Sequence, residues 1–283
     1  MNKTGLPQLL SLLDSGATQP KQRDRWREIR VVSTGDLVRI VECLHRGSHQ
    51  YRGQSRASWA LLPKLTREGG PVACGLGFGE TWQGKEQHIL SEFRTRAPRY
   101  EHDRDLTTVG DLELAIWAQH HGAPTRLLDW TLNPLAALYF AVEEGEDDHD
   151  GAVWAIAWHR ELIASSPDGP LPQLECGVRF IIPPRLFHRS ATQASILAVW
   201  GDPRLPFDDV VNSPQDLWKI IVPKEARPCI RWSLHCLGVD RETLFPDMDG
   251  LGRYLTWKHS RIHQKLYEDR CIPSRVPDES HDA

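Results

Sequence analysis

The sequence predicts an α+β fold in which helices flank a mixed sheet. Strand-like and helical segments alternate without the regular spacing of β-α-β units, which favours α+β over a doubly wound parallel sheet. The chain has 283 residues, 40% hydrophobic and 25% charged, as in ordinary globular proteins. We expect an N-terminal helical arm with a linker (1–25), one domain (26–267) and a disordered tail (268–283).

The first elements of the predicted domain follow from local patterns. Residues 28–32 alternate as a strand does, and 33–36 supply N-cap candidates for a helix that ends near 43–45. Upstream, leucines over 6–13 have the spacing of a short amphipathic helix. The glycines of 69–79 have neither dinucleotide-binding nor P-loop spacing, so we interpret this segment as a loop.

The middle of the chain carries the clearest boundaries. Helices are predicted over 80–96, 111–121 and 135–142, and a buried strand over 127–131. Gly122 and Pro124 form the expected stop of the second helix, and Asn133 with Pro134 form the expected start of the third. Further strands are expected over 151–158, 178–182 and 216–222, then helices over 227–237 and to about 267.

Charge and composition exclude several classes. The net charge of −4 and the lack of a long basic run do not indicate broad attraction to nucleic acid or an anionic membrane. No apolar stretch approaches the roughly 20 residues of a membrane helix, so we expect a cytoplasmic protein without a membrane partner. The 6 cysteines form no C-x-x-C pair, and we expect no metal site. The 11 tryptophans suit a rigid core or a pocket that stacks planar rings.

Four sequence blocks resemble the FRG domain family over roughly residues 29–255. They read Y-R-G-Q-x4-W-x-L-x-P-x-L-x-R from Tyr51, A-Q-H-H-G-A-P-T-R-L-L-D-W-T-x-N-P-L-A-A-L-Y-F-A from Ala118, R-x3-Q from Arg189, and L-G-V-D-R-E-T-L-F-P-D-M-D-G-L from Leu237. The second block is long enough to make a chance match improbable. The family commonly has Gly and Phe where this chain has Ser195 and Leu197.

The same blocks resemble the ADP-ribosyltransferases more distantly. In those enzymes an Arg-Gly on an early strand grips NAD, a Ser or Thr ends a middle strand, and a later loop carries Glu or Gln. Tyr51-Arg52-Gly53, Asp129-Trp130-Thr131 and Gln193 are similar in type and order. The resemblance implies a split sheet and NAD as a substrate.

Candidate NAD-binding residues follow from this resemblance. They are Tyr51, Arg52, Gly53, Gln54, Arg126 and Tyr139. Arg52 can direct two N–H groups at phosphate or ribose oxygens, and Gly53 lets the backbone approach the ligand. Tyr139 or a nearby Trp can stack on nicotinamide.

Candidate catalytic residues are Arg52, His120, His121, Asp129, Thr131 and Gln193. Asp129 or Thr131 can bind ribose hydroxyls, and Asp129 can stabilise positive charge on the ribose. Gln193 cannot act as a base, so His120 or His121 is the candidate for that role.

Structural roles compete with each of these assignments. Arg52 could tie a buried carboxylate such as Asp129, and both histidines could simply cap a helix C-terminus. Trp59, Trp117 and Trp130 are expected in the core rather than on a ligand. His259 and His263 lack a visible third metal ligand, and Asp247 and Asp249 are expected in a turn and helix cap.

The leading functional expectation is an NAD-dependent ADP-ribosyltransferase that modifies a protein or nucleic acid. Such an enzyme could be a toxin or phage-defence effector, with an antitoxin or regulatory partner. One alternative is a nuclease or another nucleic-acid enzyme that works through His120, His121, Arg126 and Asp129. The other is a non-catalytic domain in which Arg52, Arg126 and Arg189 recognise a nucleotide.

Overall fold

The described strands of this protein form one mixed sheet. The computed structural model describes residues 21–22, 26–44, 49–67, 81–102, 105–143, 148–157, 162–163, 169–175, 177–183, 192–211 and 217–260. Within them, a 9-stranded sheet has the order β1-β2-β9-β5-β3-β4-β8-β7-β6. The strands are β1 (Lys21–Gln22), β2 (Arg27–Arg30), β3 (His49–Gln54), β4 (Leu128–Thr131), β5 (Gly151–Ala157), β6 (Leu162–Ile163), β7 (Val178–Ile181), β8 (Ser195–Trp200) and β9 (Leu217–Val222). The predicted α+β class with a mixed sheet is confirmed, since β2 with β9 and β6 with β7 are parallel and the other pairs antiparallel.

The sheet is almost divided between β3 and β4. These strands share only the pair Tyr51–Thr131, whereas β3 pairs with β5 along its whole length, from His49 to Gln54. Side chains of the two halves pack against each other, as Trp154 of β5 and Trp130 of β4 belong to one buried cluster. The halves therefore face each other across an apolar core and diverge beyond their single junction.

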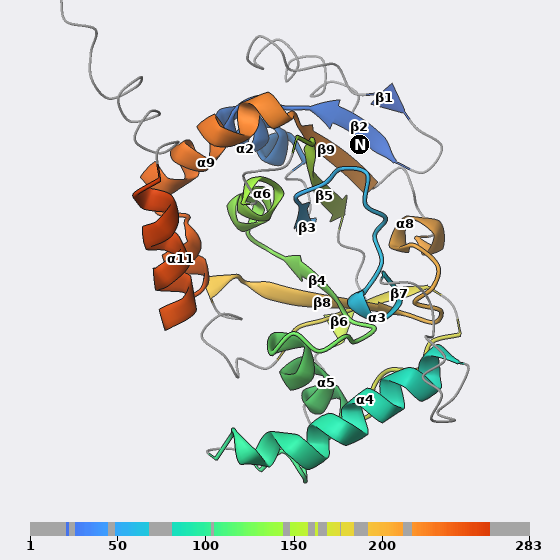
Figure 1. The fold of residues 1–283 in the computed structure, drawn as a ribbon. Helices are drawn as coiled ribbons and strands as arrows, with labels where there is room; N and C mark the ends of the chain where they lie inside the picture. The colour runs from blue at the N-terminus through green and yellow to red at the C-terminus, as the bar shows by residue number, and fades with distance from the viewer. Residues whose placement is uncertain are drawn as a thin grey trace, which may run out of the picture.

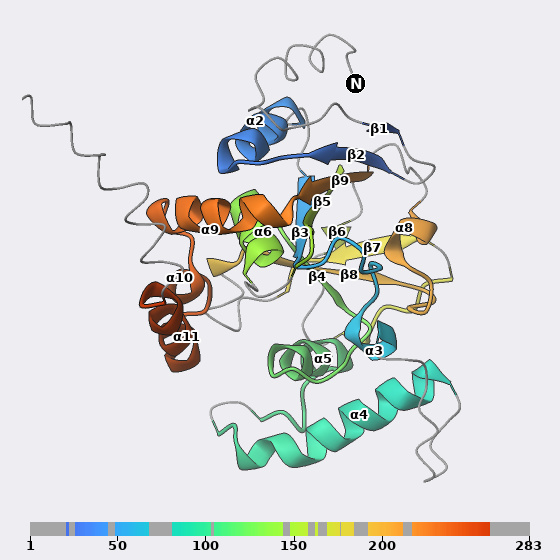
Figure 2. The same cartoon turned by 45° about the horizontal axis from the view of Figure 1, so that its top comes forward.

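Helices cover the outer faces of both halves (Figures 1 and 2). Helices α2 (Thr34–Leu44), α6 (Pro134–Val142) and α9 (Arg227–Cys236) share a core with β2, β9, β5 and β3. Helices α4 (Trp82–Arg96) and α5 (Asp111–His120) share another core with β7 and β8. The shorter α3 (Lys64–Arg67), α8 (Phe207–Val210) and α10 (Arg241–Leu244), with α11 (Met248–Lys258) and the 3-10 turns η1 (Ala97–Arg99) and η3 (Lys224–Ala226), complete the described elements.

Several predicted boundaries are confirmed by their capping geometry. Helix α5 ends at His120, and Gly122 follows with a φ of 84°, a left-handed conformation that suits glycine. The side chain of Asn133 accepts hydrogen bonds from the main-chain N–H groups of Leu135 and Ala136 at the start of α6. Asp247 caps α11 as expected.

Some expectations fall outside the described residues, namely the leucine-rich segment 6–13, the glycine-rich segment 69–79, Arg189, His263 and the tail. The hydrophobic periodicity did not predict strand β3, and only the family resemblance indicated a strand there. Among the described helices, none combines the length and the apolar character needed to cross a membrane.

Candidate active site

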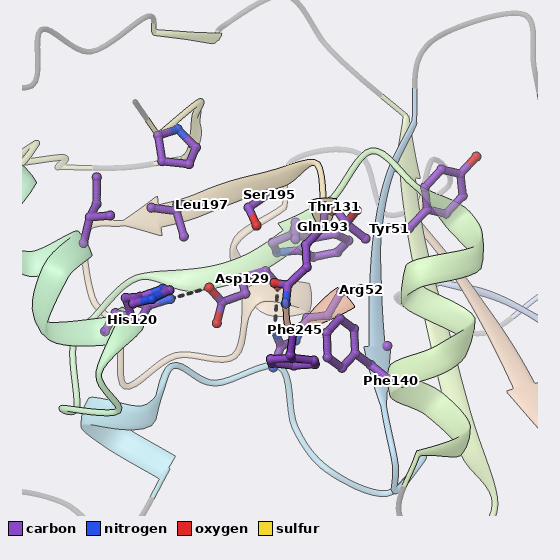
Figure 3. A pocket seen from close by; sticks show the side chains of 15 residues that line it. Tyr51, Arg52, His120, Asp129, Thr131, Phe140, Gln193, Ser195, Leu197 and Phe245 are labelled. Atoms are coloured by element: carbon purple, nitrogen blue, oxygen red, sulfur yellow. Dashed lines mark hydrogen bonds between the residues drawn. The ribbon is translucent and has the colours of Figure 1, made fainter. Parts of the chain in front are cut away.

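A cavity of about 350 Å³ opens where the two halves of the sheet diverge. It is bounded by β3, β4 and β8 and by one side each of α5 and α6 (Figure 3). Its lining consists of Tyr51, Arg52, Gly53, Ile116, Gln119, His120, Asp129, Trp130, Thr131, Phe140, Pro183, Gln193, Ser195, Leu197 and Phe245. The cavity thus gathers side chains from the first three sequence blocks and from Phe245 of the fourth.

Arg52 supplies a cation at this cavity. Its Nη1 donates a hydrogen bond to the main-chain carbonyl oxygen of Asp129 at 2.6 Å. Its Nε is buried and has no hydrogen-bond partner among the described residues. Burial lowers the pKa of Arg52 to about 10; the negative charge of Asp129 opposes this shift, and the positive charge of Arg67 adds to it. Arg52 is therefore still protonated near neutral pH.

The carboxylate of Asp129 is exposed rather than buried. Alternate residues of a strand point to opposite faces, so Leu128 and Trp130 enter the apolar core while Asp129 faces the other way. Its Oδ1 accepts a hydrogen bond from Nε2 of Gln119 at 2.5 Å, and Oδ2 accepts none from a described residue. The idea that Arg52 ties a buried Asp129 carboxylate is wrong, because Asp129 is exposed and the guanidinium bonds to its main-chain oxygen.

Gln119 lines the cavity, although the sequence did not indicate it as a site residue. Its Oε1 accepts a hydrogen bond from Oγ1 of Thr125 at 2.5 Å, which orients the amide toward Asp129. Both partners lie in the conspicuous second block, but the pairing depends on how α5 turns back to β4. The sequence contains no separate signal for it.

Thr131 holds the loop before β8 in place. Its hydroxyl donates to the main-chain oxygen of Gln193 at 2.5 Å and accepts from the N–H of Asn133 at 2.9 Å. The amide Nε2 of Gln193 donates to the main-chain oxygen of Leu244 at 2.9 Å. Because the only hydroxyl proton of Thr131 is used inside the protein, this residue positions the cavity wall rather than donating to a ribose.

The two histidines take different positions. His120 lines the cavity, whereas the ring of His121 stacks on Trp117 at a centroid distance of 6.0 Å and an interplanar angle of 18°. The two imidazoles meet edge-on, with an interplanar angle of 85°. His120 is therefore the histidine that can serve a bound ligand.

Three predicted NAD-binding residues point elsewhere. Arg126 is 2% exposed, and its Nε lies 3.2 Å from Oε2 of Glu86. Tyr139 is buried on α6, with its hydroxyl 3.3 Å from Oε1 of Glu143. Gln54 accepts a hydrogen bond from Nε1 of Trp154 at 2.8 Å. These side chains make contacts inside the protein and do not line this cavity, although Gln54 lines a smaller cavity beside it.

Tyr51 and Gly53 line the cavity but also have structural roles. Tyr51 is buried in the core beneath α6, and this burial raises its pKa to about 12. A Cβ on Gly53 would lie 1.9 Å from the main-chain oxygen of Ala137. Glycine is thus required for the contact between β3 and α6, a constraint that the ligand-approach interpretation overlooked.

An aromatic wall, also missed from the sequence, completes the cavity. The rings of Phe140 and Phe245 meet at a centroid distance of 5.9 Å and an angle of 85°. The guanidinium of Arg241 lies 3.7 Å from the centroid of Phe245 and pairs with Glu143. Within the described residues, no group of at least three His, Cys, Asp or Glu side chains could hold a metal ion.

One comparison with known proteins finds a family match over part of the chain. Residues 47–150 match the model of the FRG domain family. This match includes Arg52, His120, Asp129 and Thr131 and stops before Gln193 and Phe245. Comparisons with curated proteins and with solved structures gave no match. The chain therefore carries an FRG domain, matched over residues 47–150.

Proposed function

We propose that the cavity binds NAD and that the protein transfers ADP-ribose from NAD to a macromolecule. One observation carries this proposal: the cation of Arg52, with its unpartnered Nε, and the exposed carboxylate of Asp129 lie at the same cavity. A ligand that uses both must bear negative charge in one part and positive charge in another. NAD has this distribution in its diphosphate and its pyridinium ring.

The positive charge at the site suits the diphosphate. Arg67 is near enough to Arg52 to lower its pKa, so the two cations repel each other. A bound dianion relieves that repulsion and gives Nε of Arg52 an acceptor. Arg52 therefore has the charge and the free donor that phosphate recognition requires.

The other groups that line the cavity suit the reacting end of NAD. Cleavage breaks the bond between ribose C1′ and the nicotinamide nitrogen, and the electron pair leaves with nicotinamide, which becomes neutral. Positive charge then develops on the ribose, where the Asp129 carboxylate, oriented by Gln119, would stabilise it. A hydroxyl or amine of the acceptor forms the new bond to C1′ and passes its proton to His120. Phe140 and Phe245 offer ring faces and edges for nicotinamide.

Labelled NAD tests this proposal. Purified protein and the variants Arg52→Ala and Arg52→Lys are incubated with adenylate-labelled NAD and a cell extract, and nicotinamide release and label on protein, DNA and RNA are followed. We expect label on one class of macromolecule, lost in Arg52→Ala and reduced in Arg52→Lys, which keeps the charge but not the planar fork. Arg204→Ala, which removes an exposed arginine paired with Asp202, is the matched control and keeps full activity.

Other outcomes separate the alternatives. Nicotinamide release without macromolecular label would replace transfer with NAD hydrolysis. Binding of NAD without turnover would favour a recognition domain, and Arg52-independent cleavage of nucleic acid without NAD would favour a nuclease. A toxin or defence role makes the further prediction that expression of the native chain, and not of Arg52→Ala, arrests growth.

A further inference from the structure

A second, smaller cavity of about 140 Å³ adjoins the candidate active site. Its lining consists of Arg52, Gly53, Gln54, Ser55, Trp59, Phe140 and Glu143. Arg52, Gly53 and Phe140 line both cavities, so these residues form a common wall. A ligand that reaches past this wall can occupy both cavities at once.

Trp59 lines the second cavity with an exposed indole. Trp59 is predicted to lie in the core, as are Trp117 and Trp130, which are 8% and 2% exposed, but Trp59 is 37% exposed. The guanidinium carbon of Arg56 lies 5.7 Å from the centroid of its ring, which restrains the indole at the cavity edge. A large indole exposed in a cavity is suited to stacking against a planar base.

Glu143 adds a hydrogen-bond acceptor. Its Oε1 is used by Arg241 and by the hydroxyl of Tyr139, while Oε2 accepts no hydrogen bond from a described residue. A carboxylate oxygen that lines a cavity selects a partner that donates. Adenine donates through its exocyclic amino group, whereas hypoxanthine presents a carbonyl oxygen at the same position.

We propose that the second cavity is the adenine subsite of a dinucleotide whose diphosphate crosses at Arg52. The adenine ring would stack on Trp59 and donate to Glu143, while the nicotinamide half lies in the larger cavity. This inference rests on the proposed function, because it assigns the other end of the same NAD molecule. It also explains why Arg52 lines both cavities: the phosphates lie between the two halves of the ligand.

Calorimetry with three probes tests the subsite on the full-length protein. NAD, nicotinamide mononucleotide and AMP are titrated into the native chain and into Trp59→Ala, Trp59→Phe and Tyr100→Ala. We expect Trp59→Ala to weaken NAD and AMP by about tenfold or more, because stacking of a base on an aromatic side chain contributes at that level. The affinity for nicotinamide mononucleotide should change less than about twofold, because this probe has no adenine to stack on Trp59. Trp59→Phe should keep most of the native affinity for NAD and AMP, since phenylalanine also offers a ring for stacking. Tyr100→Ala removes an aromatic ring that is 84% exposed and should change nothing.

The hypoxanthine analogue of NAD tests the role of Glu143. We expect it to bind about tenfold more weakly than NAD to the native chain, because a carbonyl oxygen would face the carboxylate. Equal affinity of the two dinucleotides would overturn the assignment of adenine. The adenine subsite would be overturned if Trp59→Ala weakened the binding of all three probes equally, or if it weakened the binding of none.

The two proposals fail in different ways. Binding of NAD and nicotinamide mononucleotide that ignores Trp59 would remove the adenine subsite and leave NAD chemistry in the larger cavity intact. Trp59-dependent binding of AMP without binding of nicotinamide mononucleotide would support the base subsite and contradict the proposed function. Absence of binding by all three probes would overturn both.

Discussion

Arg52 and Asp129 are joined through the guanidinium of one and the main-chain carbonyl oxygen of the other, at 2.6 Å. This bond links β3 to β4 next to the single residue pair that holds the two halves of the sheet together. The Asp129 carboxylate is not used in this bond, and it accepts a hydrogen bond from Gln119 at the cavity. Removing the charge of Asp129 therefore does not remove the link to Arg52, and the chemical role of the carboxylate can be separated from the fold.

Asp129→Asn should abolish most of the activity while leaving the stability of the fold nearly unchanged. The amide keeps the shape of the side chain but cannot stabilise positive charge on a ribose, so we expect nicotinamide release to fall by about 100- to 1000-fold. Because Asp129 is exposed, the thermal midpoint should hardly move. Asp202→Asn neutralises another carboxylate, outside the cavity lining, and should keep native rates. Unchanged nicotinamide release in Asp129→Asn would remove this residue from the chemistry.

Gly53→Ala should destabilise the fold strongly. The new Cβ would lie 1.9 Å from the main-chain oxygen of Ala137 and 2.7 Å from Cβ of Phe140, so α6 must move away from β3. We expect the free energy of unfolding to fall by about 3 kcal/mol or more, measured by chemical denaturation. The control is Gly252→Ala in α11, where nothing lies within 4 Å of the added Cβ. That variant should gain about 0.5–1 kcal/mol, as alanine is the better helix former. If the free energy of unfolding of Gly53→Ala fell by no more than about 1 kcal/mol, α6 could move away from β3 at little cost.

Local chemistry made much of the fold predictable. The stop at Gly122 and the cap at Asn133 each depend on a few adjacent residues, and both are confirmed. The candidate site was harder, because a helix turns about 100° per residue and a single step decides which side chain faces a cavity. Hence Phe140 lines the cavity while Tyr139 lies in the core, and His120 lines it while His121 does not.

Long-range pairings escaped prediction for a different reason. Phe245 lines the cavity and follows Leu244, whose main-chain oxygen accepts a hydrogen bond from the amide of Gln193, a contact 51 residues apart in sequence. Arg126 stands in the same block as Asp129, yet its partner Glu86 is 40 residues away. The residues next to Arg126 in sequence do not indicate a distant partner such as Glu86. Arg126 was therefore predicted to bind a ligand.

Arg126→Met should reduce stability and leave NAD affinity nearly unchanged. It removes one member of the buried pair with Glu86 and a guanidinium that lies 5.4 Å from the centroid of Trp82. We expect a loss of about 3–5 kcal/mol in the free energy of unfolding, because Glu86 is left buried without its partner. The fraction that stays folded should bind NAD within about twofold of the native affinity, since Arg126 does not line the cavity. A tenfold loss of NAD affinity at unchanged stability would restore Arg126 as a ligand residue.

The same buried pair should give the stability a defined pH dependence. Burial raises the pKa of Glu86 above its ordinary value of 4.5, and the charge of Arg126 and the hydrogen bond from its main-chain N–H only partly oppose this shift. The folded state therefore keeps the Glu86 proton to higher pH than the unfolded state does. The Glu86 contribution to the free energy of unfolding is complete below pH 4.5 and is lost as pH rises through the raised pKa, by at most about 1.4 kcal/mol per pH unit.

Glu86→Gln isolates this contribution because its side chain does not titrate. Chemical denaturation of the native chain and of this variant between about pH 4 and 7 gives the difference between their free energies of unfolding, in which other titrating groups cancel. We expect the native chain to lose stability relative to the variant as pH rises. Glu92→Gln, which changes a half-exposed glutamate paired with Arg96, is the matched control for the loss of a carboxylate outside the buried pair. A native chain that gained stability relative to Glu86→Gln with rising pH would mean that the attraction of Arg126 outweighs burial and that the pKa of Glu86 is lowered.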